Sequence, residues 1–211
     1  MRNTILNSSF FLLLAIGFSC HGENNKNETI MTDKNYELAT FGGGCFWCTE
    51  AMFDQLNGVI TAQSGYSGGT KANPTYEEVC SGSTGHAEVI QVKFDPNVIS
   101  YLELLEVFFK THDPTTKNQQ GADKGTQYRS VILYHTTQQK NDAEKILMEL
   151  KEAHIWENPI VTEIVPFEKF YSAEAYHQEY FINNPQNSYC QLVVTPKVAK
   201  FEKLFRDKLK K

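Results

Sequence analysis

Apolar residues recur along this chain with two different periods, and each period predicts one type of secondary structure. Runs with the alternation or composition of strands lie at residues 36–41, 59–65, 86–94, 128–135, 160–167 and 191–194. Runs with apolar residues three and four positions apart, typical of helices, begin at Cys45 and after Ser100 and cover residues 138–153, 174–181 and 197–208. Because both types alternate, we predict an α+β fold, a two-layer α/β sandwich.

Local signals predict where several of these elements begin and end. Ser100 and Glu103 form a capping box ahead of an apolar helix face, so a helix begins there. Asn57-Gly58 predicts a stop after the first helix, because glycine suits the left-handed position beyond a helix end. Two polar stretches, residues 65–74 and 113–125, predict loops, and the second is long enough to carry function.

The N-terminal residues predict an export signal rather than part of the fold. Residues 1–20 combine a basic start with an apolar run at 10–18 that is too short to span a bilayer. The run closes on Cys20 and resembles a relaxed bacterial lipoprotein signal, in which that cysteine is lipidated. Gly17 departs from the aliphatic residue of the strict pattern, so plain secretion stays an alternative. We expect a flexible tether at 21–35, a catalytic domain at 36–211, and a lipid-anchored protein on the periplasmic side.

Composition and charge narrow the function classes. The chain has 211 residues, of which 41% are hydrophobic and 12% aromatic, which suits one globular domain with a sizeable core. A formal net charge of -5 gives no electrostatic reason to expect DNA or RNA as a partner.

The cysteines carry the candidate chemistry. Setting Cys20 aside leaves four, which in an exported protein could form two structural disulfides. Cys45, however, follows three glycines at a predicted helix start, where unpaired N–H groups and the helix dipole favour a thiolate. Such a setting lowers the pKa of a thiol from about 8.5 to roughly 3.5–7.5. We therefore predict that Cys45 is a nucleophile.

The residues around Cys45 resemble a known family. Gly43-Gly44-Cys45-Phe46-Trp47 followed by Glu50 is similar to the signature of the peptide methionine sulfoxide reductases of type A. Further blocks similar to that family's follow in its order, at residues 65–69, 73–76, 79–82, 84–88, 112–115, 120–130 and 176–178. The resemblance spans roughly residues 38 to 200. It implies a ferredoxin-like plait core with long functional loops, and thiol-dependent reduction of methionine S-sulfoxide, free or in oxidised proteins, as a repair activity.

The resemblance also implies a role for each site residue. Cys45 attacks the sulfoxide, Glu88 protonates its oxygen, and the phenols of Tyr76 and Tyr128 donate hydrogen bonds to the same oxygen. Phe46 and Trp47 form the apolar wall for the methyl group, and Asp123 binds substrate. Without the resemblance, Phe46 reads as a core residue and Asp123 as a solvated loop residue.

A second thiol must then condense with the sulfenic acid on Cys45. Cys190 follows Tyr189 near the C-terminus, where many family members carry the resolving cysteine. Cys48 replaces the family's usual glycine and creates a Cys-x-x-Cys pair, so resolution by Cys48, or a relay through both, stays open. Cys80 matches a non-essential family position, and we expect it to be buried.

The resemblance implies no bound cofactor or metal, a monomer, and electrons from a thioredoxin-like protein or another thiol. Export favours a periplasmic or membrane-fed thiol carrier as this donor. One alternative function is an exported thioredoxin-like disulfide oxidoreductase that uses Cys45 and Cys48. A second is a thiol hydrolase that pairs Cys45 with His86. A third is a metal-binding protein whose ligands are Cys45, Cys48, His86 and Cys190. The last has only one ligand pair at close spacing.

Overall fold

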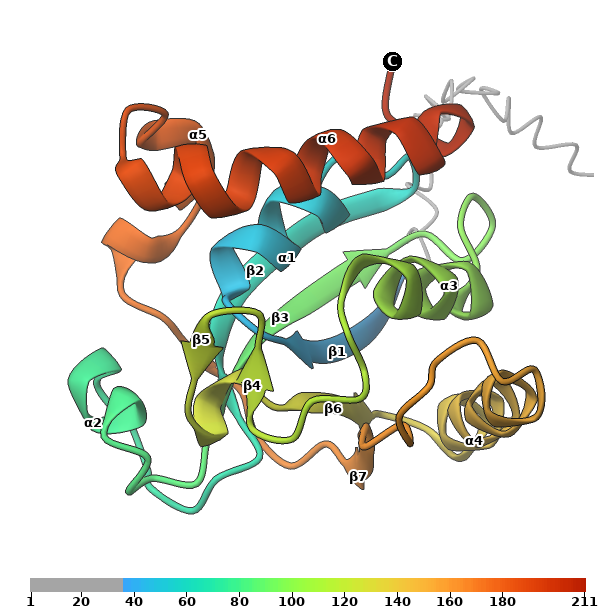
Figure 1. Cartoon of the computed structure of the whole chain (residues 1–211), viewed down its shortest axis with the longest axis horizontal. Helices are drawn as coiled ribbons and strands as arrows, with labels where there is room; N and C mark the ends of the chain where they lie inside the picture. Colours follow the sequence, from blue (N-terminus) through green and yellow to red (C-terminus); the bar gives the residue numbers. More distant parts are fainter. Residues whose placement is uncertain (1–35) are drawn as a thin grey trace, which may run out of the picture. The chain divides into compact units, whose positions relative to one another are not determined.

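A central six-stranded sheet organises the fold. The structure is a computed structural model that describes residues 36–211, so the predicted signal at 1–20, the tether at 21–35 and Cys20 lie outside the described residues. The strands stand in the order β7-β6-β1-β3-β2-β8 (Figure 1). They span Glu37–Gly43 (β1), Val59–Ser67 (β2), Ala87–Phe94 (β3), Ser130–Tyr134 (β6), Glu163–Pro166 (β7) and Tyr171–Ser172 (β8). A separate two-stranded ribbon consists of Gln119–Gln120 (β4) and Asp123–Lys124 (β5).

Helices connect these strands. They span Phe46–Phe53 (α1), Tyr76–Cys80 (α2), Tyr101–Thr111 (α3), Thr137–Glu152 (α4), Tyr180–Asn183 (α5) and Thr195–Leu204 (α6). Short 3₁₀ turns cover Thr126–Tyr128, Ala175–His177 and Arg206–Lys208, and one π-helical turn covers Cys190–Val194. None of the helices between residues 36 and 211 is long and apolar enough to cross a membrane.

The four inner strands form the predicted plait. β1-α1-β2 and β3-α3-β6 are two βαβ units whose strands interleave in the order β6-β1-β3-β2, with all neighbours antiparallel. This arrangement confirms the predicted α+β sandwich with a ferredoxin-like plait. α4 then crosses over to β7, which pairs in parallel with β6 and extends the sheet.

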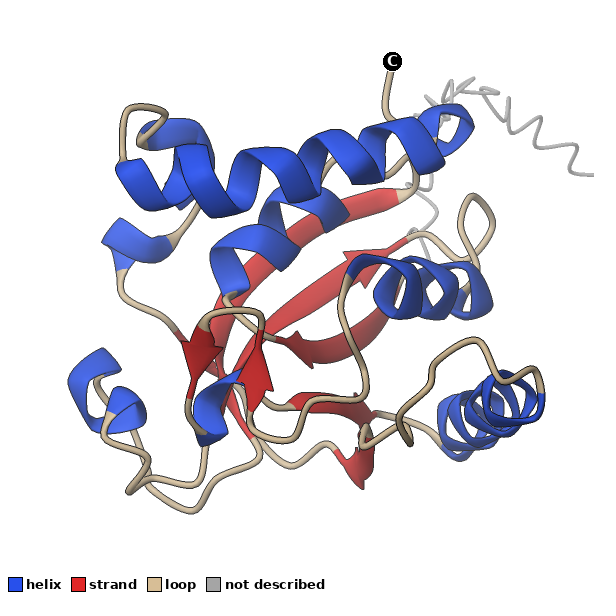
Figure 2. Ribbon diagram, in the orientation of Figure 1, coloured by secondary structure: helices blue, strands red, loops and turns tan. Residues whose placement is uncertain are grey.

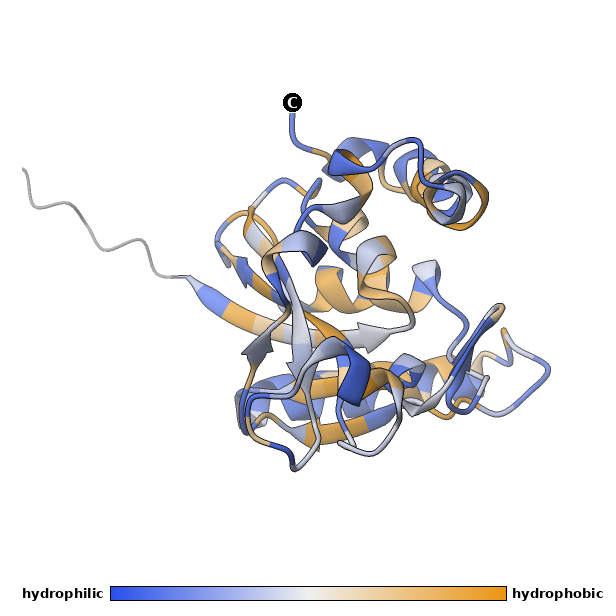
Figure 3. Cartoon of the chain, turned by 90° about the vertical axis from the view of Figure 1, so that its left-hand side faces the viewer, coloured by the Kyte–Doolittle hydropathy of each residue, from blue (hydrophilic) through white to orange (hydrophobic). Residues whose placement is uncertain are grey.

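The main core lies between the sheet and the helices. Phe41, Ile90 and Ile132 point to this side from three neighbouring strands and are fully buried. Figure 2 shows the helices beside the sheet, and the hydropathy colouring of Figure 3 shows apolar residues on these elements. The opposite face carries a smaller buried cluster that includes Val89 and Val131. Alternation along each strand thus fills both faces, as the sequence pattern predicts.

Capping explains why the helices begin where they do. Ser100 Oγ accepts the Glu103 N–H at 3.3 Å while Glu103 Oε2 accepts the Ser100 N–H at 2.9 Å, which confirms the predicted capping box of α3. The same arrangement between Thr75 and Glu78 begins α2, a short helix for which the sequence analysis made no prediction.

Two predicted elements near the C-terminus are wrong. Residues 191–194 form the π-helical turn rather than a strand, because the chain there already winds into α6, which has Pro196 in its first turn. The Thr195 hydroxyl donates to the Cys190 carbonyl at 2.9 Å and closes this turn. The helix predicted at 174–181 is instead a 3₁₀ turn and α5, separated by Glu179 in the left-handed region with φ of 53°.

Candidate active site

Cys45 lies at the sharp turn from β1 into α1. Gly44 adopts φ of 94°, and a Cβ there would lie 2.5 Å from Gln120 Cγ, so both conformation and space require glycine. Cys45 is the N-cap residue of α1, as predicted, and its side chain is only 7% exposed. The thiol therefore sits at the positive end of the helix dipole, inside the protein.

Cys45 opens onto a cavity of about 300 Å³. The walls come from segments far apart in the sequence, and they include seven of the predicted site residues. The lining residues are Cys45, Phe46, Trp47, Tyr76, Glu88, Asp123, Tyr128, Asn187 and Tyr189.

Glu88 supplies an acid beside the thiol. It lies on β3, is 1% exposed, and its Oε2 accepts the N–H of Phe46 at 3.0 Å. Burial raises the pKa of Glu88 well above its ordinary value, and negative charge on Cys45 raises it further, while the Phe46 N–H lowers it. A carboxyl with a raised pKa holds a proton that it can donate near neutral pH.

Two phenols face the same space. Burial raises the pKa of Tyr76 and of Tyr128, and the negative charge of Glu88 raises both further. Both hydroxyls therefore stay protonated and act as hydrogen-bond donors at the cavity. An oxygen atom bound there would meet one acid and two donors, which suits a group that gains negative charge during reaction.

The aromatic wall is held from behind by two residues. Trp47 Nε1 donates to His177 Nδ1 at 3.1 Å, and the indole stacks on Tyr180 with ring centroids 3.7 Å apart and planes 7° apart. The His177 ring also packs against Phe46 at 5.0 Å. Burial lowers the pKa of His177, which favours the neutral ring that accepts at Nδ1.

Asp123 and Tyr189 form the opposite rim. The Tyr189 hydroxyl donates to Asp123 Oδ2 at 2.6 Å. The same phenol lies beside the Cys45 sulfur and lowers the pKa of that thiol. Asp123 thus orients a phenol next to the Cys45 thiol, besides lining the cavity.

The roles of His177 and Tyr189 were missed by sequence reasoning. His177 appeared only within a family block, and Tyr189 only as the neighbour of Cys190. The bonds that give them roles join residues 130 and 66 positions apart, so no local pattern reveals them.

The Cys45 and Cys48 thiols interact directly. Their mutual hydrogen bond raises the pKa of Cys45, with burial adding to the rise, and the same bond lowers the pKa of Cys48. The positive charge of Lys197 lowers the pKa of Cys48 as well. The raised pKa of Cys45 differs from the lowered pKa that the sequence pattern predicts. The difference arises because burial and the neighbouring Cys48 thiol both oppose a negative charge on Cys45.

Cys190 completes a group of three sulfurs. It is fully buried, and burial raises its pKa, with a further rise from negative charge on Cys45. Its N–H donates to the side-chain oxygen of Asn187 at 3.3 Å, and Asn187 lines the cavity. Cys80 is only half-buried, rather than buried as expected, and its thiol contacts the Tyr76 hydroxyl.

Two alternative chemistries fail on geometry. His86 Nδ1 accepts the Gly69 N–H at 3.0 Å and Nε2 lies 2.8 Å from the Lys71 carbonyl, so backbone groups occupy both nitrogens and His86 cannot pair with Cys45. Within residues 36–211, no three His, Cys, Asp or Glu side chains are grouped to hold a metal ion. All four cysteines there are free thiols, which contradicts the reading of two structural disulfides.

A buried cysteine at a helix start, an acid and two phenols around one cavity, on a ferredoxin-like plait, define a thiol-based oxidoreductase. Comparison with known proteins agrees. A family model described as "Peptide methionine sulfoxide reductase" matches residues 37–209. The chain therefore belongs to the peptide methionine sulfoxide reductase family, type A, and the thioredoxin-like alternative is wrong.

Relatives named "Peptide methionine sulfoxide reductase MsrA" are similar over most of the chain. The protein from Saccharolobus solfataricus is 56% identical over 174 residues, covering 82% of this chain and 97% of its own. A protein from Thermus thermophilus is 51% identical over 174 residues, covering 82% of this chain and 98% of its own.

Solved structures agree as well. Mxr1 from Saccharomyces cerevisiae in reduced form aligns with a TM-score of 0.67 and 41% identity, covering 74% of this chain and 89% of that chain. Methionine sulfoxide reductase A of Corynebacterium diphtheriae aligns with a TM-score of 0.65 and 36% identity, covering 72% and 76%.

Proposed function

We propose that this protein reduces methionine S-sulfoxide, free or within oxidised proteins, to methionine. The observation that carries the proposal is the cavity of about 300 Å³ on which the Cys45 thiol, the Glu88 carboxyl and the phenols of Tyr76 and Tyr128 converge beside Trp47. A sulfoxide requires a soft nucleophile, a proton for its oxygen and an apolar seat for its methyl group. Each requirement meets a matching group there.

The first step transfers one oxygen atom. The Cys45 thiolate attacks the sulfoxide sulfur, Glu88 gives its proton to the oxygen, and Tyr76 and Tyr128 donate hydrogen bonds to that oxygen. The oxygen then moves to Cys45. Cys45 loses two electrons and becomes a sulfenic acid, while the sulfoxide sulfur gains them and leaves as methionine. Phe46 and Trp47 hold the methyl group, and Asp123 binds substrate through the rim it shares with Tyr189.

Cys48 assists this step by taking a proton. Because the pKa of Cys48 is lowered, this thiol can ionise, and passing the Cys45 proton to the Cys48 sulfur then generates the Cys45 thiolate with a donor beside it. This proton transfer makes the Cys45 sulfur nucleophilic, although burial opposes the loss of its proton to solvent.

The second step releases water. A thiol condenses with the sulfenic acid to form a disulfide, and a dithiol later reduces that disulfide. We assign the resolving role to Cys190, with Cys48 as the alternative or as a relay after it. Peptide mapping of the disulfide after one turnover without reductant tests this order, and a bridge joining only Cys45 and Cys48 contradicts the assignment to Cys190.

The proposals for the reductant and for the cellular location are based on the sequence. We propose a thioredoxin-like thiol carrier as donor, no bound cofactor, a monomer, and export through residues 1–20 with lipid attachment at Cys20. Fractionation of cells grown with a labelled fatty acid tests the anchor. An unlabelled protein found intact in the soluble periplasm contradicts it.

Turnover tests the activity itself. With dithiothreitol as reductant, the wild-type protein consumes the S epimer of a methionine sulfoxide peptide and spares the R epimer. Cys45→Ser abolishes turnover, and comparison of Cys48→Ser with Cys190→Ser ranks the two candidate resolving thiols. A wild-type protein that leaves the S epimer unchanged refutes the proposal.

A further inference from the structure

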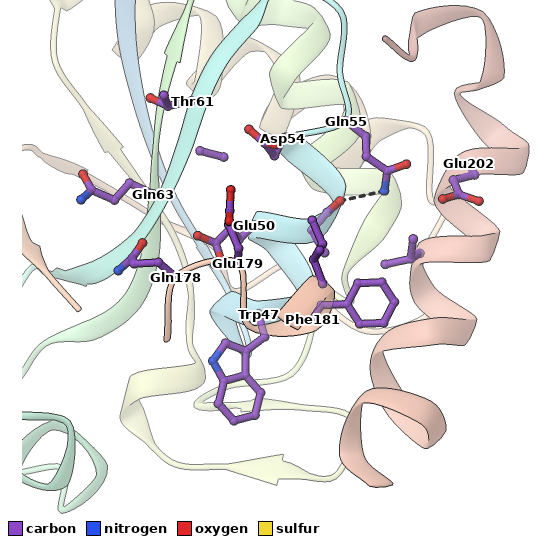
Figure 4. Close-up of a pocket in the computed structure, with 14 residues that line it drawn as sticks. Trp47, Glu50, Asp54, Gln55, Thr61, Gln63, Gln178, Glu179, Phe181 and Glu202 are labelled. Carbon is purple, nitrogen blue, oxygen red and sulfur yellow. Dashed lines mark hydrogen bonds between the residues drawn. The ribbon is translucent and has the colours of Figure 1, made fainter. Parts of the chain in front are cut away.

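Glu50 is a buried carboxyl that the chemistry above does not use. It lies on α1, five residues after Cys45, and is 4% exposed. It lines a second cavity, of about 590 Å³, rather than the catalytic one. Trp47 lines both cavities, so the two share one wall. Figure 4 shows Glu50 at the base of this second cavity, between β2 on one side and α6 on the other.

Glu50 holds a strained turn in place. Its Oε2 accepts the N–H of Glu179 at 2.9 Å. Glu179 has φ of 53°, a left-handed conformation that non-glycine residues adopt only with support from their surroundings. The neighbouring Gln178 amide is fixed separately, since it bonds both backbone groups of Ser64 on β2. Glu50 therefore ties the backbone of Glu179 to α1.

The turn at Glu179 joins the two residues that position Trp47. His177 precedes it and accepts the indole N–H at 3.1 Å, while Tyr180 follows it and stacks on the indole at 3.7 Å. A change in the conformation of Glu179 moves one of these contacts relative to the other. The Glu50 hydrogen bond thus acts on the methyl-binding wall without touching substrate.

The groups around Glu50 determine its pKa. Asp54 directly after α1, Glu179 on the turn and Glu202 on α6 line the same cavity, and β2 contributes only uncharged side chains. Among residues 36–211, no basic side chain lines it. Burial raises the pKa of Glu50 to about 7, with a further rise from the charge of Glu179, while polar groups of Ser64 and the Glu179 N–H oppose the rise. The ionised form is the stronger acceptor for the Glu179 N–H.

We propose that Glu50 is a positioning residue whose carboxylate, through the Glu179 amide, holds His177 and Tyr180 against Trp47, and whose protonation loosens this wall of the substrate cavity. The proposal rests on the sulfoxide reductase function for its kinetic consequence, but its structural consequence can be measured without any substrate.

Trp47 itself reports on the wall. The chain has two tryptophans, Trp47 and Trp156, and Trp156→Phe leaves Trp47 as the only indole. In this background we expect the fluorescence of Trp47 to change in one step centred near pH 7, which is the pKa of Glu50. Glu50→Gln keeps the shape but cannot ionise, so the step disappears and the low-pH spectrum persists at pH 8.

Glu179→Gln tests whether Glu50, rather than another titrating group, produces the fluorescence step. It removes an exposed charge that raises the pKa of Glu50 and keeps the backbone N–H, so the fluorescence step moves to lower pH. Glu202→Gln is a matched control on the cavity wall that has no bond to Glu179, and it keeps the step. A step that persists unchanged in Glu50→Gln belongs to His177 or to the thiols and overturns the proposal.

Kinetics provide the second readout. At pH 8, Glu50→Gln raises the KM for a methionine S-sulfoxide peptide by about fivefold and leaves kcat within about twofold, because charge-assisted hydrogen bonds are roughly twice as strong as neutral ones. Near pH 5.5 the variant and its parent have the same KM. Equal KM values at pH 8 overturn the proposal. A fluorescence step in a protein that reduces no sulfoxide overturns the proposed function and leaves the positioning role intact.

Discussion

Replacing Glu88 by glutamine tests the acid that the mechanism requires. The substitution preserves shape and lets the side-chain oxygen keep accepting the Phe46 N–H, which lies 3.0 Å from Glu88 Oε2. It removes the carboxyl proton that the proposed mechanism delivers to the sulfoxide oxygen. General acid catalysis contributes typically about 10²–10⁴-fold, so the rate of methionine formation falls by about that factor.

The pH profile sharpens this test. Glu88 must be protonated to act, and burial raises its pKa, so the wild-type rate falls as pH rises through that pKa. Glu88→Gln loses this descending limb, since glutamine does not titrate. Tyr76→Phe and Tyr128→Phe serve as matched controls: each removes one donor, slows the reaction by about tenfold, and retains the limb.

Single-turnover release of methionine in the absence of reductant is the appropriate assay, because it isolates oxygen transfer from disulfide recycling. A Glu88→Gln protein that releases methionine within about fivefold of the wild-type rate contradicts the reasoning, since general acids contribute at least about 10²-fold. So does a variant that is slow but keeps the same descending limb, because the titrating group is then a different one.

Three further predictions concern stability and the thiols. The pKa of Glu50 rises from 4.5 to about 7 on folding, so the folded state loses stability as pH rises between these values. Glu50→Gln cannot ionise, so we expect it to be more stable than the wild type at pH 8 by up to about 3 kcal/mol. Urea denaturation measures this difference, which disappears below pH 4.5. Cys48→Ser removes the thiol that most raises the pKa of Cys45, so the pH midpoint for alkylation of Cys45 moves down, and an upward move contradicts this account of the two thiols. Gly44→Ala lowers the melting temperature by several degrees, since its Cβ lies 2.5 Å from Gln120 Cγ at φ of 94°, and an unchanged melting temperature shows that the turn relaxes.

Local sequence signals correctly predicted the helix starts that depend on neighbouring residues alone. The glycine run and the apolar face placed Cys45 at a helix start, and the Ser100 capping box placed the start of α3. The strand predicted at 191–194 is wrong because its apolar residues belong to the winding that leads into α6. Short apolar runs are compatible with either element, and tertiary packing decides between them.

The chemistry of the site was predicted less completely. The family motifs supplied Cys45, Glu88 and the two phenols, and the structure places them around one cavity. The state of the thiols depends on contacts that a sequence does not display. The expectation for Cys45 considered the unpaired N–H groups and the helix dipole of α1, whereas the neighbouring Cys48 thiol and burial raise its pKa.

The central claim is that Cys45 takes the oxygen from methionine S-sulfoxide. The most direct measurement uses the Cys48→Ser, Cys190→Ser double variant, which retains Cys20, Cys45 and Cys80. The variant is mixed with the S epimer and a sulfenic-acid trapping reagent. The account predicts one methionine released per protein molecule and the trap attached to the peptide that contains Cys45. Methionine release with the trap on Cys80, or no release at all, contradicts it.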